Sequence, residues 1–194
     1  MVQQVTDPQG NFTITSDFIT SSSSYTGTPV ILFDASVVAT GAAPSKSNTK
    51  EYIQVDAPNS LSRTLGIETT VIEPAIATST TTISFTPYRS DVFNLSAGQS
   101  FSEQFTTNLT FVVTGFPISS TSEVKRTRQF NGIETITVPA GTFSACKFTE
   151  NGTSTSQGQT TTDETSTLWV MTGDGLPLKA ISGSNVTELV SYKF

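Results

Sequence analysis

The stretch "ETITVPAGTFSACKF", which runs from Glu134 to Phe148, decides the fold because it reads as a strand, a tight turn and a second strand. Apolar and polar residues alternate around the turn, with the period of two that is typical of a strand in a sheet. Pro139 fixes its own φ and Gly141 can adopt a positive φ, so "PAG" predicts the turn. We interpret this hairpin as a segment that fixes strand register.

The only cysteine of the chain, Cys146, follows this turn. It shares a strand face with Phe148, so we expect it in the core beside Ile136 and Val138, where a thiol behaves as a small hydrophobe. A reactive thiol is the alternative, but the chain has no histidine that would lower the pKa of this cysteine. A single cysteine also excludes an intramolecular disulfide.

The strand-and-turn pattern continues to the end of the chain. The connections "PAG", "QGQ", "GDG" and "GSN" are short, so strands that are neighbours in sequence should pair antiparallel. The dipeptide Asn131-Gly132 falls inside a strand pattern, where we expect a bulge rather than a turn. The sequence therefore predicts a C-terminal meander over residues 98–194, whose last five strands are residues 123–138, 142–156, 160–172, 176–182 and 186–194.

Strand-like runs also recur over residues 11–95. The nearly continuous apolar run at residues 30–40 predicts a strand that is buried on both faces. Polar loops are expected at residues 21–29 and 41–49, and one long bent strand at residues 98–116. No linker composition separates the two halves, so we predict a single β domain over residues 1–194.

The composition favours an all-β fold. The chain contains 35 Thr and 26 Ser, whereas only 13% of its residues are charged. Thr is β-branched and favours strands, and the charged residues that usually cover helix surfaces are sparse. We predict one large curved antiparallel sheet, arranged as a half-barrel or as a two-sheet sandwich, with solvent faces covered by hydroxyl groups.

Charge and hydropathy argue against nucleic-acid binding and against a transmembrane helix. The net charge is −6, and the single basic cluster "KRTR" at Lys125–Arg128 places only half of its side chains on each strand face, so we read it as a solvated strand and predict no nucleic-acid binding. No run approaches the ~20 apolar residues of a transmembrane helix. We expect a periplasmic or extracellular protein whose signal peptide has been removed.

The hairpin and the segments "TLWVMTGDGLPLK" and "TELVSYKF" resemble a bacterial cell-envelope family that is labelled TapB-like or as a domain of unknown function. The resemblance covers residues 98–194 and departs from the family pattern at Pro177. It implies an exported, β-rich domain, such as a curved sheet like those of envelope lipoprotein carriers, and it implies no catalytic residues. The residues that carry it are Gly132, Glu134, Ile136, Val138, Pro139, Ala140, Gly141, Thr142, Phe143, Trp169, Gly173, Gly175, Leu176, Glu188 and Leu189.

The chain lacks the residues of most catalytic and cofactor sites. Without histidine there is no Ser-His-Asp arrangement and no His-ligated metal, and no phosphate-binding glycine motif occurs. We therefore predict no cofactor, no metal and no catalytic residue. The surface that we expect a partner to contact is the sole tryptophan, Trp169, with the turn Gly173, Asp174 and Gly175. Core packing is the alternative for Trp169.

Three functions remain open. The first is a non-enzymatic, exported cell-envelope protein that binds an apolar small molecule or lipid on a concave sheet face, with more inward-facing Phe, Leu and Val than its neighbours can cover. The second is a structural or adhesive surface module that binds a protein partner through sheet edges, which requires a filled core and an exposed edge strand. The third, a hydrolase that uses carboxylates alone, requires Glu residues clustered in one cleft.

Overall fold

The computed structural model describes residues 1–194 except 8–9, 42–43, 74–78, 114 and 194. The described chain is almost entirely β-structure, and its one helical element is the short 3₁₀ helix η1 (Ala57–Asn59). The strands are β1 (Val2–Asp7), β2 (Gly10–Tyr25), β3 (Thr28–Thr40), β4 (Ser45–Asp56), β5 (Leu61–Glu73), β6 (Ser79–Val92), β7 (Ser100–Val113), β8 (Phe116–Val138), β9 (Gly141–Ser156), β10 (Gln159–Thr162), β11 (Ser166–Met171), β12 (Pro177–Ser182) and β13 (Asn185–Ser191).

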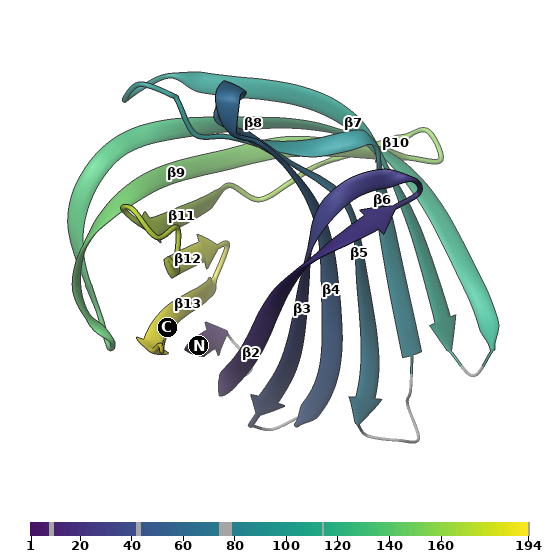
Figure 1. Ribbon diagram of the computed structural model, residues 1–194, viewed down its shortest axis with the longest axis horizontal. Coiled ribbons are helices and arrows are strands. Elements are labelled where there is room, and N and C mark those ends of the chain that lie inside the picture. Colours follow the sequence, from purple (N-terminus) through teal and green to yellow (C-terminus); the bar gives the residue numbers. More distant parts are fainter. Residues whose placement is uncertain (8–9, 42–43, 74–78, 114, 194) are drawn as a thin grey trace.

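All thirteen strands belong to one antiparallel sheet, which confirms the predicted large curved sheet (Figure 1). Strands that are neighbours in sequence pair from β1 to β9, β9 continues through β11 and β12 to β13, and β13 pairs with β1. These pairings join twelve strands into a closed barrel, with β10 as an additional strand. The closure distinguishes this fold from the half-barrel and the two-sheet sandwich that the sequence left open.

Several predicted boundaries were wrong, because polar Ser and Thr runs form strands here rather than loops. Residues 21–25 complete β2, and the turn is only Thr26-Gly27, while residues 45–49 begin β4. The predicted strand 160–172 is split into β10 and β11, and Phe116 starts β8 instead of ending the strand before it. The predicted last strand ends at Ser191; residue 194 lies outside the described residues.

The inner face of the barrel wall carries more large apolar side chains than the outer face does. Antiparallel pairing aligns Phe33, Glu51, Ile67, Ile83 and Leu109 in one row across β3 to β7. Alternation then places Arg89 and Phe85 of β6 on the same face, where they line a hollow together with residues of β8, β9 and β11, so this face is the concave one. The neighbouring row on the convex face is Ile19, Asp34, Lys50, Glu68, Thr82, Thr110 and Ser119.

The strand at residues 30–40 is therefore not buried on both faces, as the apolar run predicted. Within β3, only Val30 is buried, while Ile31 and Val38 are exposed. The run is instead part of a single-layer wall, in which one face lines the barrel interior and the other meets solvent.

The dry core occupies one part of the barrel, between the tip of the β8–β9 hairpin and strands β11 to β13. Its buried side chains are Val138, Ala145, Trp169, Leu176, Leu178 and Leu189, and Phe143 packs on Tyr192 at its edge. The Ala140 amide donates a hydrogen bond to the Leu189 carbonyl, which joins the hairpin tip to β13. Figure 1 shows β8 and β9 curving around these last strands.

The opening hairpin forms as predicted, but its register places Cys146 on the other face. The turn is Pro139-Ala140, and Gly141 already pairs with Val138, so Ile136 faces Phe143 and shares its side of the sheet with Ala145. Ala145 is fully buried, whereas Cys146 is only partly buried and pairs with Ile133. The predicted bulge at Asn131-Gly132 is confirmed by a register shift and by a positive φ at Gly132.

Among the described residues, no helix has the length and apolar character that crossing a membrane requires.

Candidate functional site

A polar site lies inside the barrel, where β6 separates from β7. Residues 79–86 of β6 pair with β7, but this pairing stops before Pro87. Residues 89–92 still pair with β5, and Ser90 is joined to β7 and β8 by side chains. The Ser90 amide donates to both carboxylate oxygens of Glu103, at 3.2 and 3.0 Å. Arg126 Nη2 donates to the Ser90 carbonyl. Glu103 and Arg126 thus replace the missing ladder hydrogen bonds of Ser90.

Arg126 is the centre of a set of ion pairs that we call the arginine cluster. Its guanidinium group lies 2.7 Å from Glu103, 3.2 Å from Glu150 and 3.5 Å from Asp91, and its side chain is only 9% exposed. Arg128 joins it through Asp91, and we include the separate neighbouring ion pair of Arg89 and Glu51 in the cluster. The cluster thus comprises three basic side chains, Arg89, Arg126 and Arg128, and four acidic ones, Glu51, Asp91, Glu103 and Glu150.

The two outer arginines of the cluster also lie over aromatic rings. Arg128 pairs with Asp91 and lies 4.4 Å from the centroid of the Phe148 ring. Arg89 lies 3.4 Å from Glu51 and 5.5 Å from the centroid of the Phe85 ring. A guanidinium group stacks well on an aromatic face while its edge binds carboxylates. The cluster therefore joins the polar centre of the barrel to its aromatic lining.

Two hollows flank the arginine cluster, and Arg89, Arg126, Glu150 and Ser166 line both of them. The first, of about 260 Å³, is bounded by the edge-to-face pair Phe85 and Phe105. The second, of about 330 Å³, is further lined by Asp91, Arg128, Phe148, Thr167, Leu168, Ala180, Ile181 and Ser182. The two hollows are thus neighbouring parts of the barrel interior, each with charged groups on one side and apolar groups on another.

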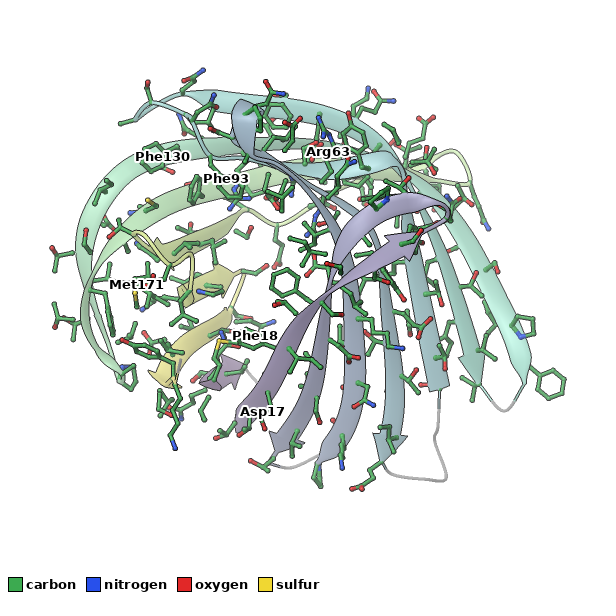
Figure 2. All side chains as sticks on the ribbon, in the orientation of Figure 1. Asp17, Phe18, Arg63, Phe93, Phe130 and Met171 are labelled. Carbon is green, nitrogen blue, oxygen red and sulfur yellow. The ribbon has the colours of Figure 1, made fainter. Side chains whose placement is uncertain are left out.

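A third hollow, of about 380 Å³, lies against the end of β6 and a neighbouring stretch of β7. It is lined by Leu61, Tyr88 and Val92 on one side and by Phe101 and Glu103 on the other. Arg63 stacks on Tyr88 at 5.1 Å and pairs with Asp56 at 3.0 Å. Figure 2 labels Arg63 and Phe93 at this end of the barrel.

The inner face beyond these hollows carries apolar side chains that the chain leaves partly uncovered. We call this surface the apolar wall; it consists of Ile31, Phe33, Ile53, Ile67, Ile83, Leu109 and Phe111. All of these residues are half-buried or exposed, whereas the cluster of buried apolar residues lies around β11 to β13. Phe105, which borders the first hollow, is the buried aromatic at the start of this wall.

The chemistry of the cluster is charge pairing. Glu103 and Glu150 both lie against Arg126, so the structure brings together two of the glutamates that a carboxylate-only hydrolase would need. Both are engaged by the Arg126 guanidinium group, and Asp163 and Glu164 line the first hollow together with Glu150. The described residues contain no group of His, Cys, Asp and Glu side chains that could hold a metal ion.

The sequence predicted that Trp169 and the turn at residues 173–175 form one contact surface, but the structure buries the tryptophan and exposes the turn. Trp169 is 9% exposed and packs in the dry core. Its Nε1–H donates to Glu134 at 2.6 Å, and this hydrogen bond, with help from Lys147 and against the effect of partial desolvation, lowers the pKa of Glu134. Gly173, Asp174 and Gly175 form an exposed turn between β11 and β12. Only the turn is therefore available for contact, and the indole serves the core.

Sequence reasoning missed the arginine cluster. Reading "KRTR" as a solvated strand was wrong for Arg126 and Arg128, whose side chains are 9% and 12% exposed. The alternation itself was right, because Lys125 is exposed on the opposite face. The signal that could have revealed the site is Glu103, a lone charge on the strand face that it shares with Phe101 and Phe105, because a charge on an apolar face requires a buried partner.

Comparisons with known proteins returned nothing: no family model, no curated protein and no solved structure matches this chain.

Proposed function

We propose that this protein is a non-enzymatic, exported protein of the cell envelope that binds an apolar small molecule or a lipid inside its barrel. The observation that carries the proposal is the apolar wall: its side chains face the barrel interior, yet none of them is buried. Leaving so much apolar surface in water is unfavourable by about 25 cal/mol per Å², and a ligand would remove that cost.

The hollows beside the arginine cluster support this proposal in size and lining. The larger, of about 330 Å³, lies at the lower end of the ~300–1,000 Å³ that is typical of ligand sites, and the smaller, of about 260 Å³, adjoins it. Their lining combines aromatic rings with a few fixed polar groups, which is the usual composition of a small-molecule site. An apolar tail along the wall and a polar end near the hollows would match this arrangement.

The alternative is a structural or adhesive module that binds a protein partner through a sheet edge. The free edge that favours it most is β10, whose four residues are all exposed. Strands of this length offer few backbone groups for pairing, and β10 carries only Gln and Thr side chains. The apolar wall is not used in this alternative, so we place it second.

Native mass spectrometry of gently purified protein, beside the same sample denatured and extracted into organic solvent, tests the proposal. We expect an extra mass that is lost on denaturation and recovered in the organic phase. Displacement of a fluorescent fatty acid then tests the location of the ligand. The double variant Ile67→Thr and Ile83→Thr should weaken its binding at least about tenfold, because two apolar contacts are lost.

A matched control makes the same kind of substitution, apolar residue to Thr, on the outer face. Leu32→Thr with Val112→Thr removes two apolar side chains from the convex side of β3 and β7 and should leave binding unchanged. Equal loss of binding in both double variants, at equal thermal stability, would refute the inner face as the ligand site. Failure of the wild-type protein to bind the probe would contradict the proposal and favour a protein partner at the edge of β10.

A further inference from the structure

The hairpin that connects β7 and β8 exposes two large apolar side chains at its end. Phe116 is 76% exposed and Ile118 is 65% exposed. Phe116 pairs with Val113, and Ile118 pairs with Phe111, so all four side chains lie on the inner face of the sheet. The hairpin thereby extends the apolar wall to the rim of the barrel, and Figure 1 shows β7 and β8 reaching the rim far from the dry core.

This hairpin carries no charge over a long stretch. No Asp, Glu, Lys or Arg occurs from Gln104 to Ser122, a run of 19 residues, although the whole chain has a net charge of −6. Bringing charged groups into an apolar phase is costly, and a segment without them avoids that cost. The polar groups next to the exposed pair are hydroxyls of Ser and Thr, such as Ser119, which bonds to Thr110.

The size of the exposed surface argues against a protein partner. A stable protein interface buries about 800 Å² on each side, which two side chains cannot supply. Binding to a lipid bilayer does not require a large protein surface, because each apolar side chain that enters the interface is buried by the acyl chains around it. Two side chains give weak and reversible attachment rather than stable anchoring.

We infer that the β7–β8 hairpin docks this protein on a zwitterionic lipid surface, with Phe116 and Ile118 inserted into the bilayer interface. The docking presents the rim of the barrel, and the apolar wall behind it, to the membrane. Because the chain is acidic, an anionic bilayer would repel it at low salt. This inference goes beyond the proposed function and does not depend on it, since the hairpin can insert whether or not the barrel holds a ligand.

Flotation with phosphatidylcholine vesicles tests the docking. We expect wild-type protein to float with the vesicles, and the fraction bound to change little with salt. Phe116→Ser with Ile118→Ser should reduce the partition coefficient about tenfold or more, because the inserted apolar area is lost. Ile19→Ser with Ile133→Ser removes two side chains of similar exposure, 70% and 64%, from β2 and from a distant part of β8, and should float as the wild type does.

A local probe separates insertion from indirect effects. In a Cys146→Ala background, an environment-sensitive fluorophore on Phe116→Cys should shift to the blue when vesicles are added, whereas the same fluorophore on Ile19→Cys should not. Equal flotation of the two double variants, or no spectral shift at position 116, would overturn the inference. So would light scattering that shows a wild-type dimer and a monomeric Phe116→Ser/Ile118→Ser variant, because the hairpin would then bind a second copy of the chain.

Discussion

Arg126 on β8 lies directly opposite Glu103 on β7 in the strand register, and their side chains approach to 2.7 Å with about nine-tenths of each removed from solvent. Both side chains also bind the backbone of Ser90, where β6 no longer pairs with β7. The ion pair therefore ties the end of β6, which still pairs with β5 on its other side, to β7 and β8. This dual role makes the pair the most sensitive point of the candidate site.

Replacing Arg126 with Leu should destabilise the protein by about 3–5 kcal/mol, because it leaves Glu103 without its charged partner in a buried place. The free energy of unfolding, from urea denaturation followed by circular dichroism, measures the effect. Lys125→Leu on the adjacent, exposed position is the control and should change stability by less than about 0.5 kcal/mol. Similar losses for the two variants would show that the buried ion pair is not what holds β6.

Ser166 lines both hollows beside the arginine cluster, so Ser166→Phe should fill the space between them. We expect binding of a fluorescent fatty acid to weaken about tenfold or more, because the ring would occupy volume that the ligand needs. Thr165→Phe is the matched control, since Thr165 is exposed and lines neither hollow. Unchanged affinity of the Ser166→Phe variant would place the ligand elsewhere in the barrel.

The lowered pKa of Glu134 should make the free energy of unfolding depend on pH in the acidic range. Trp169 Nε1–H donates to its carboxylate and lowers its pKa, and Lys147 acts in the same direction. A carboxyl whose pKa is lower in the folded state stabilises the protein above its unfolded pKa of about 4.3, and this contribution is lost as the pH falls through the folded pKa. Between about pH 6 and pH 3, the unfolding free energy of Glu134→Gln should fall less steeply than that of the wild type. Parallel pH profiles would contradict the assignment.

Gly66 on β5 leaves room for the ring of Tyr25, which comes from β2 and packs on Tyr52 of β4. Tyr25, at the end of β2, packs on Tyr52 with ring centroids 4.6 Å apart, and a Cβ added at Gly66 would overlap its hydroxyl. Gly66→Ala should therefore destabilise the protein by about 1–3 kcal/mol. The same change in a Tyr25→Ala background should cost much less, and a double-mutant cycle measures this difference. Additive effects would mean that the two residues do not touch in solution.

The sequence of this protein determined its local structure because local structure depends on near neighbours. Alternation, β-branched Thr and short Gly-containing turns predicted an all-β chain, an antiparallel meander and the bulge at Asn131-Gly132. The same alternation placed Arg126 and Arg128 on one face and Lys125 on the other. Local errors arose where runs of Ser and Thr were read as loops and where the hairpin turn was one residue too long. A turn of two residues in place of three moved Cys146 away from Ile136, since a shift of one residue exchanges the faces of a strand.

The tertiary structure alone decided that the sheet closes, that "KRTR" supplies two buried arginines, and that Trp169 is core while the turn after it is surface. Each of these facts depends on partners that are far apart in sequence. Val2, at the start of β1, pairs with Ser191 at the end of β13. Arg126 of β8 can bind the Ser90 carbonyl because β6 no longer pairs with β7 at that residue. A single sequence carries the pattern of each strand, but the long-range pairing that makes one face an interior and the other an exterior arises only when the barrel closes.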